Sequence, residues 1–280
     1  MAKSASFPTV SAFASARAAL PAGVVAVLLC ESARHVQASA ERLAEQGAAA
    51  IIYVGREEVC DLEGPAEIAI AERPRTDRYR KQLNALFDAL DGRWVLWLWN
   101  AEFFVFPYCE TRSLAEMTGF LQDERRRVLF SYALDLYGTR LPAAKDDPRQ
   151  TGLCFDRIGY HAFPKPGQQL RVYGGLGWRF EELAPRGMQQ IGRSCLIRAQ
   201  RGQHLNREML FGDDDYDSVS CKWHNSPTGA VMTLRRSSRI MAHENFPAAS
   251  DRLMWQGTTA WDWSSQQLLE LGMIEPGQWF

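Results

Sequence analysis

Hydrophobic and polar positions follow two alternating patterns over residues 23–99. Residues 24–29 are a continuous run of valine, alanine and leucine, which is typical of a parallel strand that is covered on both faces. Val36, Ala40 and Leu43 then recur at helical spacing with charged residues between them. In chain order, these patterns predict strands at residues 24–29, 49–54, 67–71 and 93–99, and helices at residues 36–44 and 79–90.

The second half of the chain has a less regular pattern. It predicts strand-like pieces at residues 127–137, 160–163, 170–173, 194–199 and 219–223, and helices at residues 228–242, 248–256 and 264–271, the last with Ser264 as its N-cap. The strand and helix order of the first half predicts an α/β fold, in which an open, mostly parallel sheet carries helices on both faces. We expect the C-terminal half to be irregular α+β structure.

The domain organisation follows from the same patterns. Residues 23–280 are predicted to form a single domain, because no repeat or linker interrupts them. Residues 1–22 are rich in Ala and Ser, contain Lys3 and Arg17 and lack acidic side chains. We expect this segment to be a loosely held N-terminal arm.

Composition excludes several classes of protein. The 280 residues carry 32 Lys and Arg against 33 Asp and Glu, so the whole-chain signature of a nucleic-acid binder is missing. No stretch is apolar for long enough to predict a transmembrane helix. The six cysteines are widely spaced and form no Cys-x-x-Cys pair, so we interpret them as buried, reduced thiols of a cytosolic protein. Nine tryptophans are the unusual feature.

Charged residues follow the predicted strands of the first half. In an open α/β sheet, ligands bind at the carboxyl ends of the strands near a switch in strand order. The positions there are Glu31, Arg56, Glu72 and the segment 100–102. This mixture of acids and arginines suits a ligand that brings both a metal ion and phosphates, although ordinary loop charge would have the same composition.

The stretch from Gly92 to Pro107, which reads GRWVLWLWNAEFFVFP, resembles family 2-like glycosyltransferases of the GT-A fold. In that family a strand ends in Asp-x-Asp-Glu-Phe and is followed by Val-Tyr-Pro. The similarity continues through residues 109–114, the strand end at 133–137 and the Gly-Gly-x-x-x-Arg-Phe element at 174–180. His224 and His243 fall where such proteins carry two late histidines.

The resemblance implies a GT-A-like nucleotide-diphospho-sugar transferase of the hexosyltransferase type, acting in polysaccharide biosynthesis. A sugar would pass from a nucleotide-diphosphate sugar to a glycan or lipid-linked acceptor by single displacement with inversion. Residues 23–107 would bind the nucleotide sugar, and residues 108–280 the acceptor. No nucleic-acid partner is expected. We expect a cytoplasmic protein and leave open whether it associates peripherally with the inner face of a membrane.

The family's acidic motif holds Mg²⁺ or Mn²⁺ against the two phosphates, because a departing diphosphate needs a strong counter-charge. This sequence departs from that motif. If Glu102 aligns with the family's Glu, then Trp99 and Ala101 replace the two aspartates, and Asn100-x-Glu102 is a weakened equivalent. The resemblance implies Glu102 and His243 as metal ligands, and Glu31 and Asn100 as nucleotide-sugar contacts. Alternatively, Glu102 is a strand-end acid paired with an arginine.

Phosphates have a second candidate site in the basic run of residues 73–81. It precedes a predicted helix, and a helix N-terminus attracts anions. Arg78 and Arg80 are therefore predicted phosphate ligands, with a solvated helix start as the alternative. Asp135, at the end of an apolar strand, and Asp215, in the acidic segment 212–217, are predicted catalytic bases; a solvated turn is the alternative for Asp215.

The tryptophans allow two interpretations. Trp97 and Trp99 point to one face of the fourth predicted strand, where they either pack in the core or stack against a sugar. Trp99 lies at the ligand-facing end of that strand. A second function, of another class, is a catalytically degenerate GT-A domain that binds a glycan, a nucleotide or a protein partner; the replacements at Trp99 and Ala101 favour it.

Overall fold

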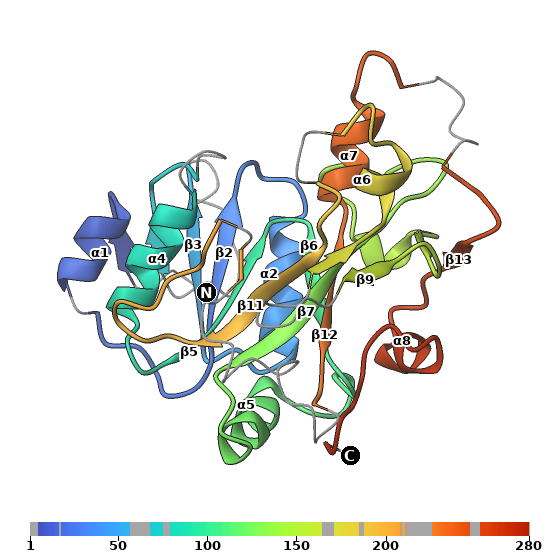
Figure 1. Ribbon diagram of the computed structural model, residues 1–280. Helices are drawn as coiled ribbons and strands as arrows, with labels where there is room; N and C mark the ends of the chain where they lie inside the picture. The colour runs from blue at the N-terminus through green and yellow to red at the C-terminus, as the bar shows by residue number, and fades with distance from the viewer. Residues whose placement is uncertain are drawn as a thin grey trace.

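The apolar runs of the sequence form the centre of a nine-stranded mixed sheet in the computed structural model (Figure 1). The structure describes residues 5–16, 18–56, 68–74, 79–163, 171–184, 188–207, 209–210, 226–246 and 253–279. Within these ranges, the strands of the large sheet are β1 (Ala5–Phe7), β2 (Val25–Cys30), β3 (Ala50–Gly55), β4 (Ile68–Ile70), β5 (Trp94–Trp99), β6 (Glu102–Val105), β7 (Val128–Asp135), β11 (Gly192–Arg198) and β12 (Gly229–Thr233).

Helices and two small sheets complete the described structure. The small sheets pair β8 (Cys154–Asp156) with β13 (Thr258–Ala260), and β9 (His161–Phe163) with β10 (Arg171–Tyr173), each antiparallel. The helices are α1 (Val10–Ala16), α2 (Val36–Glu45), α4 (Tyr79–Ala89), α5 (Leu114–Asp123), α6 (Leu176–Arg179), α7 (Arg235–Met241) and α8 (Ser265–Glu270), with a 3-10 turn at Pro148–Gln150.

The strand order of the large sheet is β1-β4-β3-β2-β5-β11-β7-β12-β6. Strands β1, β4, β3, β2 and β5 are parallel neighbours. Strand β11 runs antiparallel between β5 and β7, β12 is parallel to β7, and β6 is antiparallel to β12. The predicted α/β class with a mostly parallel sheet is confirmed.

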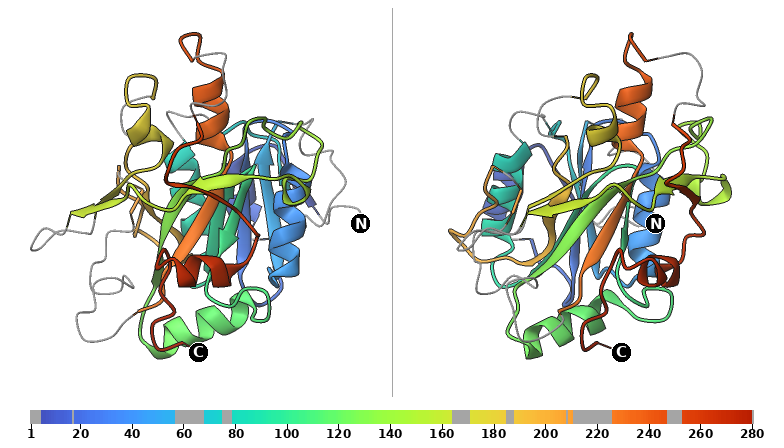
Figure 2. Two further views of the ribbon diagram at one scale, coloured as in Figure 1. Left: turned by 90° about the vertical axis from the view of Figure 1, so that its right-hand side faces the viewer. Right: turned by 45° about the vertical axis from the view of Figure 1, so that its right-hand side comes forward.

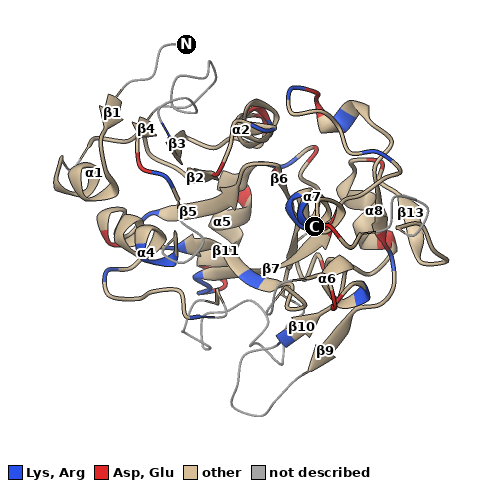
Figure 3. Ribbon diagram, turned by 90° about the horizontal axis from the view of Figure 1, so that it is seen from above, with Lys and Arg blue, Asp and Glu red and all other residues tan. Residues whose placement is uncertain are grey.

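Helices lie on both faces of the sheet, as the pattern predicts. Seen along the sheet in Figure 3, α2 lies on one side of the parallel strands and α4 and α1 lie on the other. The six residues of β2 and the six of β5 are all buried, which explains their continuous apolar sequences. Helices α6 and α7 stand at one end of the sheet, above the carboxyl end of β7, in Figure 1 and both views of Figure 2.

Two predictions about local structure are wrong. Residues 5–16 are not loosely held: β1 pairs with β4 in the sheet, and the α1 side chains Val10 and Phe13 are buried. The helix expected at residues 228–242 is instead β12 followed by α7. All five residues of β12 are buried, and a short, fully buried strand has no alternation that would separate it from a helix.

Other predictions agree with the described residues. Ser264 is the N-cap of α8 and accepts a hydrogen bond from the backbone N–H of Gln266. Cys30, Cys109, Cys154 and Cys195 are buried, and no disulfide joins them. No helix in the described part of the chain has the length and apolar character needed to cross a membrane. The predicted strand at 219–223 lies outside the described residues.

Candidate functional site

Strand register brings three polar residues together at one edge of the sheet. Thr233 at the end of β12 is opposite Asp135 at the end of β7 and opposite Glu102 at the start of β6. Strand β11 is antiparallel to its neighbours, so its first residues, Gly192 and Arg193, lie at this same edge. Strands β3 and β4 extend the sheet on one side of β2, and β5 extends it on the other side. The strand order therefore also reverses at this edge, next to β2. This is the place where an open α/β sheet binds ligands.

A cavity of about 550 Å³ lies at this edge. Its aromatic walls come from α4 and β5, and its polar walls from β6, β11, α7 and the segment 188–192. The lining residues are Tyr79, Trp97, Trp99, Glu102, Ala133, Met188, Gln190, Ile191, Gly192, Arg193, Arg207, Met209, Thr233, Arg235, Arg236 and Arg239. Among these described residues, five arginines face a single carboxylate, so the cavity is strongly cationic.

Glu102 is buried and forms a bidentate ion pair with Arg193. Its two oxygens accept hydrogen bonds from the guanidinium at 3.2 and 2.7 Å, and Oε2 also accepts the backbone N–H of Trp99 at 2.9 Å. Burial opposes ionisation of this carboxyl, but the guanidinium groups of Arg193 and Arg235 outweigh it and hold its pKa below the usual range. Ala101 turns the chain between β5 and β6 with a φ of 61°.

The two tryptophans of β5 each support an arginine. The guanidinium of Arg193 lies 4.4 Å from the ring centroid of Trp97, and that of Arg235 lies 3.8 Å from the ring centroid of Trp99. Tyr79 packs edge-on against Trp99 with 4.9 Å between ring centroids. Desolvated cation–π contacts of this kind fix a guanidinium without neutralising it. Both tryptophans line the cavity, and their rings hold cations there.

Helix α7 brings three further cations to the cavity, and Figure 3 shows the Lys and Arg positions of this helix in blue. Arg235 and Arg239 pair with Glu31 at 2.7 and 3.2 Å. Arg236 donates to the carbonyl of Gln190 at 2.9 Å, and its Nη1 is buried without a hydrogen-bond partner among the described residues. We call Arg193, Arg235, Arg236 and Arg239 the arginine cluster. Glu31 thus contacts the cluster and does not line the cavity.

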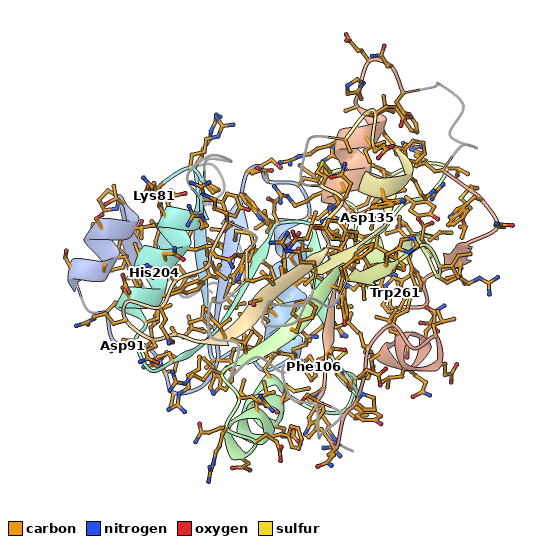
Figure 4. The ribbon with its side chains drawn as sticks, in the orientation of Figure 1. Lys81, Asp91, Phe106, Asp135, His204 and Trp261 are labelled. Atoms are coloured by element: carbon orange, nitrogen blue, oxygen red, sulfur yellow. The ribbon has the colours of Figure 1, made fainter. Side chains whose placement is uncertain are left out.

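Asp135 lies beneath α6 and α7 at the end of β7 (Figure 4). Its Oδ2 accepts the backbone N–H of Leu176 at 2.8 Å, and its Oδ1 lies 3.7 Å from Nε of Arg236. Burial raises the pKa of this carboxyl to about 6 against the opposing effect of Arg236. A Cβ at Gly175, where φ is 68°, would lie 2.5 Å from Oδ2, so this close approach requires glycine. Asp135 does not line the cavity.

The other predicted site residues lie apart from the cavity or outside the described residues. The Asn100 side chain accepts the N–H of Glu31 at 3.0 Å and donates to the carbonyl of Arg34 at 2.9 Å, so it ties the ends of β2 and β5 together. Arg80 donates to the carbonyl of Leu205 at 3.3 Å. His243 accepts the N–H of its neighbour Asn245 at 3.2 Å in the turn after α7. The predicted residues Arg78, Asp215 and His224 lie outside the described residues.

The residues at the Asp-x-Asp position do not fit a divalent metal ion. Both oxygens of Glu102 are engaged by Arg193, and the nearest lining groups are guanidinium groups that would repel a second cation. Trp99 and Ala101 offer no side-chain ligand. Within the described ranges, no group of three or more His, Cys, Asp or Glu side chains is placed to hold a metal ion.

Sequence reasoning missed the arginine cluster. Arg235, Arg236 and Arg239 were hidden by the expectation of one helix over residues 228–242, in which they would be an ordinary solvated face. The available signal was the Arg-Arg pair that directly follows the segment 229–234, because cations just after a strand lie at the edge of the sheet where ligands bind in open α/β folds. Arg193 had no such signal, since only the antiparallel placement of β11 brings it here.

No family model matches the chain, and no curated protein matches it in sequence.

Proposed function

We propose that this chain is a glycosyltransferase that moves a sugar from a nucleotide-diphosphate sugar to a glycan or lipid-linked acceptor. The observation that carries the proposal is the cavity at the edge where the strand order reverses, with five arginines and one carboxylate in its described lining. Its volume of about 550 Å³ is in the range of small-molecule sites. We assign a nucleotide-diphosphate sugar to this cavity because residues 92–107 resemble family 2-like glycosyltransferases, which use such donors.

The chemistry of the lining suits a diphosphate ester. Arginine forks bind phosphate oxygens with paired, charge-assisted hydrogen bonds, and they stay charged at all physiological pH values. Trp99 and Tyr79 add aromatic surface next to these cations. A departing nucleoside diphosphate gains negative charge as the glycosidic bond breaks, so cations fixed beside it stabilise the transition state more than the ground state.

One observation favours a second candidate, a binding domain without catalysis. The carboxylate in the described lining of the cavity, Glu102, is held by Arg193, and Asp135 lies outside the lining. An inverting transfer needs a base that takes the acceptor hydroxyl proton. A domain of this second kind would bind the donor and leave it intact.

Donor binding and turnover separate the two candidates. The purified protein is screened by thermal shift against UDP-, GDP- and dTDP-sugars, and each donor that binds is incubated with the protein while release of its nucleotide is measured. Binding with nucleotide release supports the glycosyltransferase. Binding of a donor that stays intact with every acceptor tested supports the binding domain. No shift with any donor contradicts both.

The matched pair of variants is Arg235→Gln and Arg198→Gln. Arg235 lines the cavity, whereas Arg198 lies at the opposite end of β11 from Arg193 and donates to Gln122 at 3.3 Å. Each variant loses one positive charge. If donor binding weakens in Arg235→Gln and persists in Arg198→Gln, the donor binds in this cavity. An equal loss in both variants would show that binding depends only on the net charge of the protein.

A further inference from the structure

The arginine cluster occupies the position at which the sequence resemblance puts a metal ion. Trp99, which stands where the family has its first aspartate, carries the guanidinium of Arg235 over its ring at 3.8 Å. Glu102, which would otherwise ligate the metal, holds Arg193 through two hydrogen bonds. Both motif residues therefore fix cations in place and are not arranged to bind a divalent ion.

The arginine cluster carries more positive charge than its carboxylate partners in the described structure neutralise. Arg235 and Arg239 share one carboxylate, that of Glu31. Arg236 lies 3.7 Å from a carboxylate oxygen of Asp135, and Nη1 of its guanidinium is buried without a hydrogen-bond partner in the described structure. Burial of unsatisfied donors and excess like charge is unfavourable for the empty protein. An anion with several oxygens would relieve both.

Two arginines of the cluster are held in place from two sides. Arg193 is clamped between Glu102 and the Trp97 ring, and Arg235 between Glu31 and the Trp99 ring. Side chains that are already ordered lose little conformational entropy when a ligand binds. A metal ion normally supplies a positive charge of fixed position opposite the phosphates. The guanidinium groups of Arg193 and Arg235, each held between a carboxylate and a ring, supply such a charge from the chain itself.

We propose that the arginine cluster binds the diphosphate of the nucleotide donor directly, so that donor binding requires no divalent metal ion. The proposal rests on the function proposed above and specifies how this site neutralises its ligand. Arg235 and Arg236 contact phosphate oxygens, and Arg193 adds positive potential from beneath them. Trp97 and Trp99 act as positioning residues, because each acts through the guanidinium that it supports.

The test measures binding of UDP, GDP and inorganic pyrophosphate to the full chain by isothermal titration calorimetry, once with EDTA and once with Mn²⁺. We expect at least one of the nucleoside diphosphates to bind with the same Kd, within about twofold, in both buffers. We expect Arg235→Gln to weaken that binding by about tenfold or more, which is the effect of losing a charge-assisted hydrogen bond. Arg198→Gln, at the other end of β11, should leave it unchanged.

Each result has a defined meaning. Binding that occurs with Mn²⁺ and vanishes with EDTA overturns the metal-free site and leaves the proposed function standing. Metal-free binding that is equally strong in Arg235→Gln and Arg236→Gln overturns the assignment to the cluster. Absence of binding by every nucleotide and nucleotide sugar contradicts the proposed function itself. Thermal melts of the variants separate loss of binding from loss of folding, and the comparison of the two buffers needs no variant.

The role of Trp99 has its own readout. Trp99→Phe keeps an aromatic ring under Arg235, and Trp99→Leu keeps apolar volume without a ring quadrupole. If the ring positions the guanidinium, Trp99→Phe should bind the diphosphate more tightly than Trp99→Leu. Equal affinities in two folded variants would remove Trp99 from the site.

Discussion

Two clusters in this protein, each containing a buried carboxylate, combine that carboxylate with arginine and a tryptophan ring, yet they differ in charge balance. In the first cluster, Asp156 accepts hydrogen bonds from the Tyr137 hydroxyl, from Arg179 at 2.8 and 3.0 Å, and from the Trp255 indole N–H at 2.6 Å. Arg179 lies 4.8 Å from the Trp255 ring centroid and donates to the carbonyl of Leu253 at 2.7 Å. We call Asp156, Arg179, Tyr137 and Trp255 the Asp156 hub.

Among the residues that the structure describes, the Asp156 hub pairs one carboxylate with one arginine, and its donors converge on that carboxylate. Its members come from the segment that follows β7, from β8, from α6 and from the segment before β13, so the hub connects the C-terminal half of the chain to the end of a strand of the large sheet. The arginine cluster has the same ingredients with an excess of cations beside a cavity. Balanced charge favours a structural role, whereas four arginines that share three carboxylates in the described structure, next to a cavity, favour an anionic ligand.

Removing the Asp156 carboxylate is the strongest test of the structural half of this comparison. Asp156→Ala removes the buried carboxylate from the Arg179 guanidinium, whose side chain is 17% exposed, and breaking a largely buried pair in this way costs about 3–5 kcal/mol. We expect a loss of that size in the free energy of unfolding, measured by urea denaturation. The Kd of the folded variant for a nucleoside diphosphate should stay unchanged. A loss below about 1 kcal/mol or a large change in that Kd would contradict the distinction.

Asp135 interacts electrostatically with a carboxylate of each cluster, Asp156 and Glu102, and its titration should make a pH-dependent contribution to stability. Its folded-state pKa is about 6, against the ordinary value of 3.8, because burial outweighs the guanidinium of Arg236 and the N–H of Leu176, with Asp156 and Glu102 adding repulsion. The folded state therefore keeps a proton that the unfolded chain has already released. The contribution of Asp135 to the free energy of unfolding should fall as pH rises from about 4 to about 6, by up to about 3 kcal/mol.

The variant Asp135→Asn isolates this effect, because it keeps the volume of the side chain and its acceptor for the Leu176 N–H while removing the titration. As pH rises from about 4 to about 7, the unfolding free energy of Asp135→Asn should increase relative to that of the parent chain by up to about 3 kcal/mol. Urea denaturation at a series of pH values measures the difference. Parallel pH profiles for the two proteins would show that Asp135 does not titrate in this range.

Glu102→Gln tests the cavity half of the comparison. Loss of the carboxylate charge leaves Arg193 without its ion partner and should lower the unfolding free energy by about 2 kcal/mol, less than at the Asp156 hub because Trp97 still supports the guanidinium. Binding of a nucleoside diphosphate in EDTA should stay equal or become tighter, since the cavity gains net positive charge. Calorimetry checks this. If binding is lost in the variant, Glu102 belongs to the ligand site after all.

The sequence predicted the parallel strands well for a physical reason. Strands β2 and β5 are buried on both faces, so their positions are apolar without interruption, and local composition is enough to find them. The edge at the carboxyl ends of the parallel strands could be predicted too, because it follows from strand direction. Trp99 was correctly assigned to that edge: it lines the cavity.

The chemistry of the site depends on contacts that no local pattern encodes. Arg193 meets Glu102 across 91 positions of sequence, and Arg235 meets Glu31 across 204. The basic run at residues 73–81 stood out only because its charges are adjacent, and Arg80, one of its described members, donates to the carbonyl of Leu205 and does not line the cavity. Cations dispersed along the chain and gathered by topology have no signature in a sequence window.

Arg239 should have the smallest effect and so marks the outer boundary of the arginine cluster. Its side chain is 41% exposed, and it shares Glu31 with the more buried Arg235. Exposed ion pairs contribute little, so Arg239→Gln should change the unfolding free energy by less than about 0.5 kcal/mol. Binding of a nucleoside diphosphate should weaken by about twofold to threefold at low salt, and salt should screen this difference away. Calorimetry at low and high salt checks both. A loss as large as that of Arg235→Gln, persisting at high salt, would move Arg239 into direct contact with phosphate and extend the site along α7.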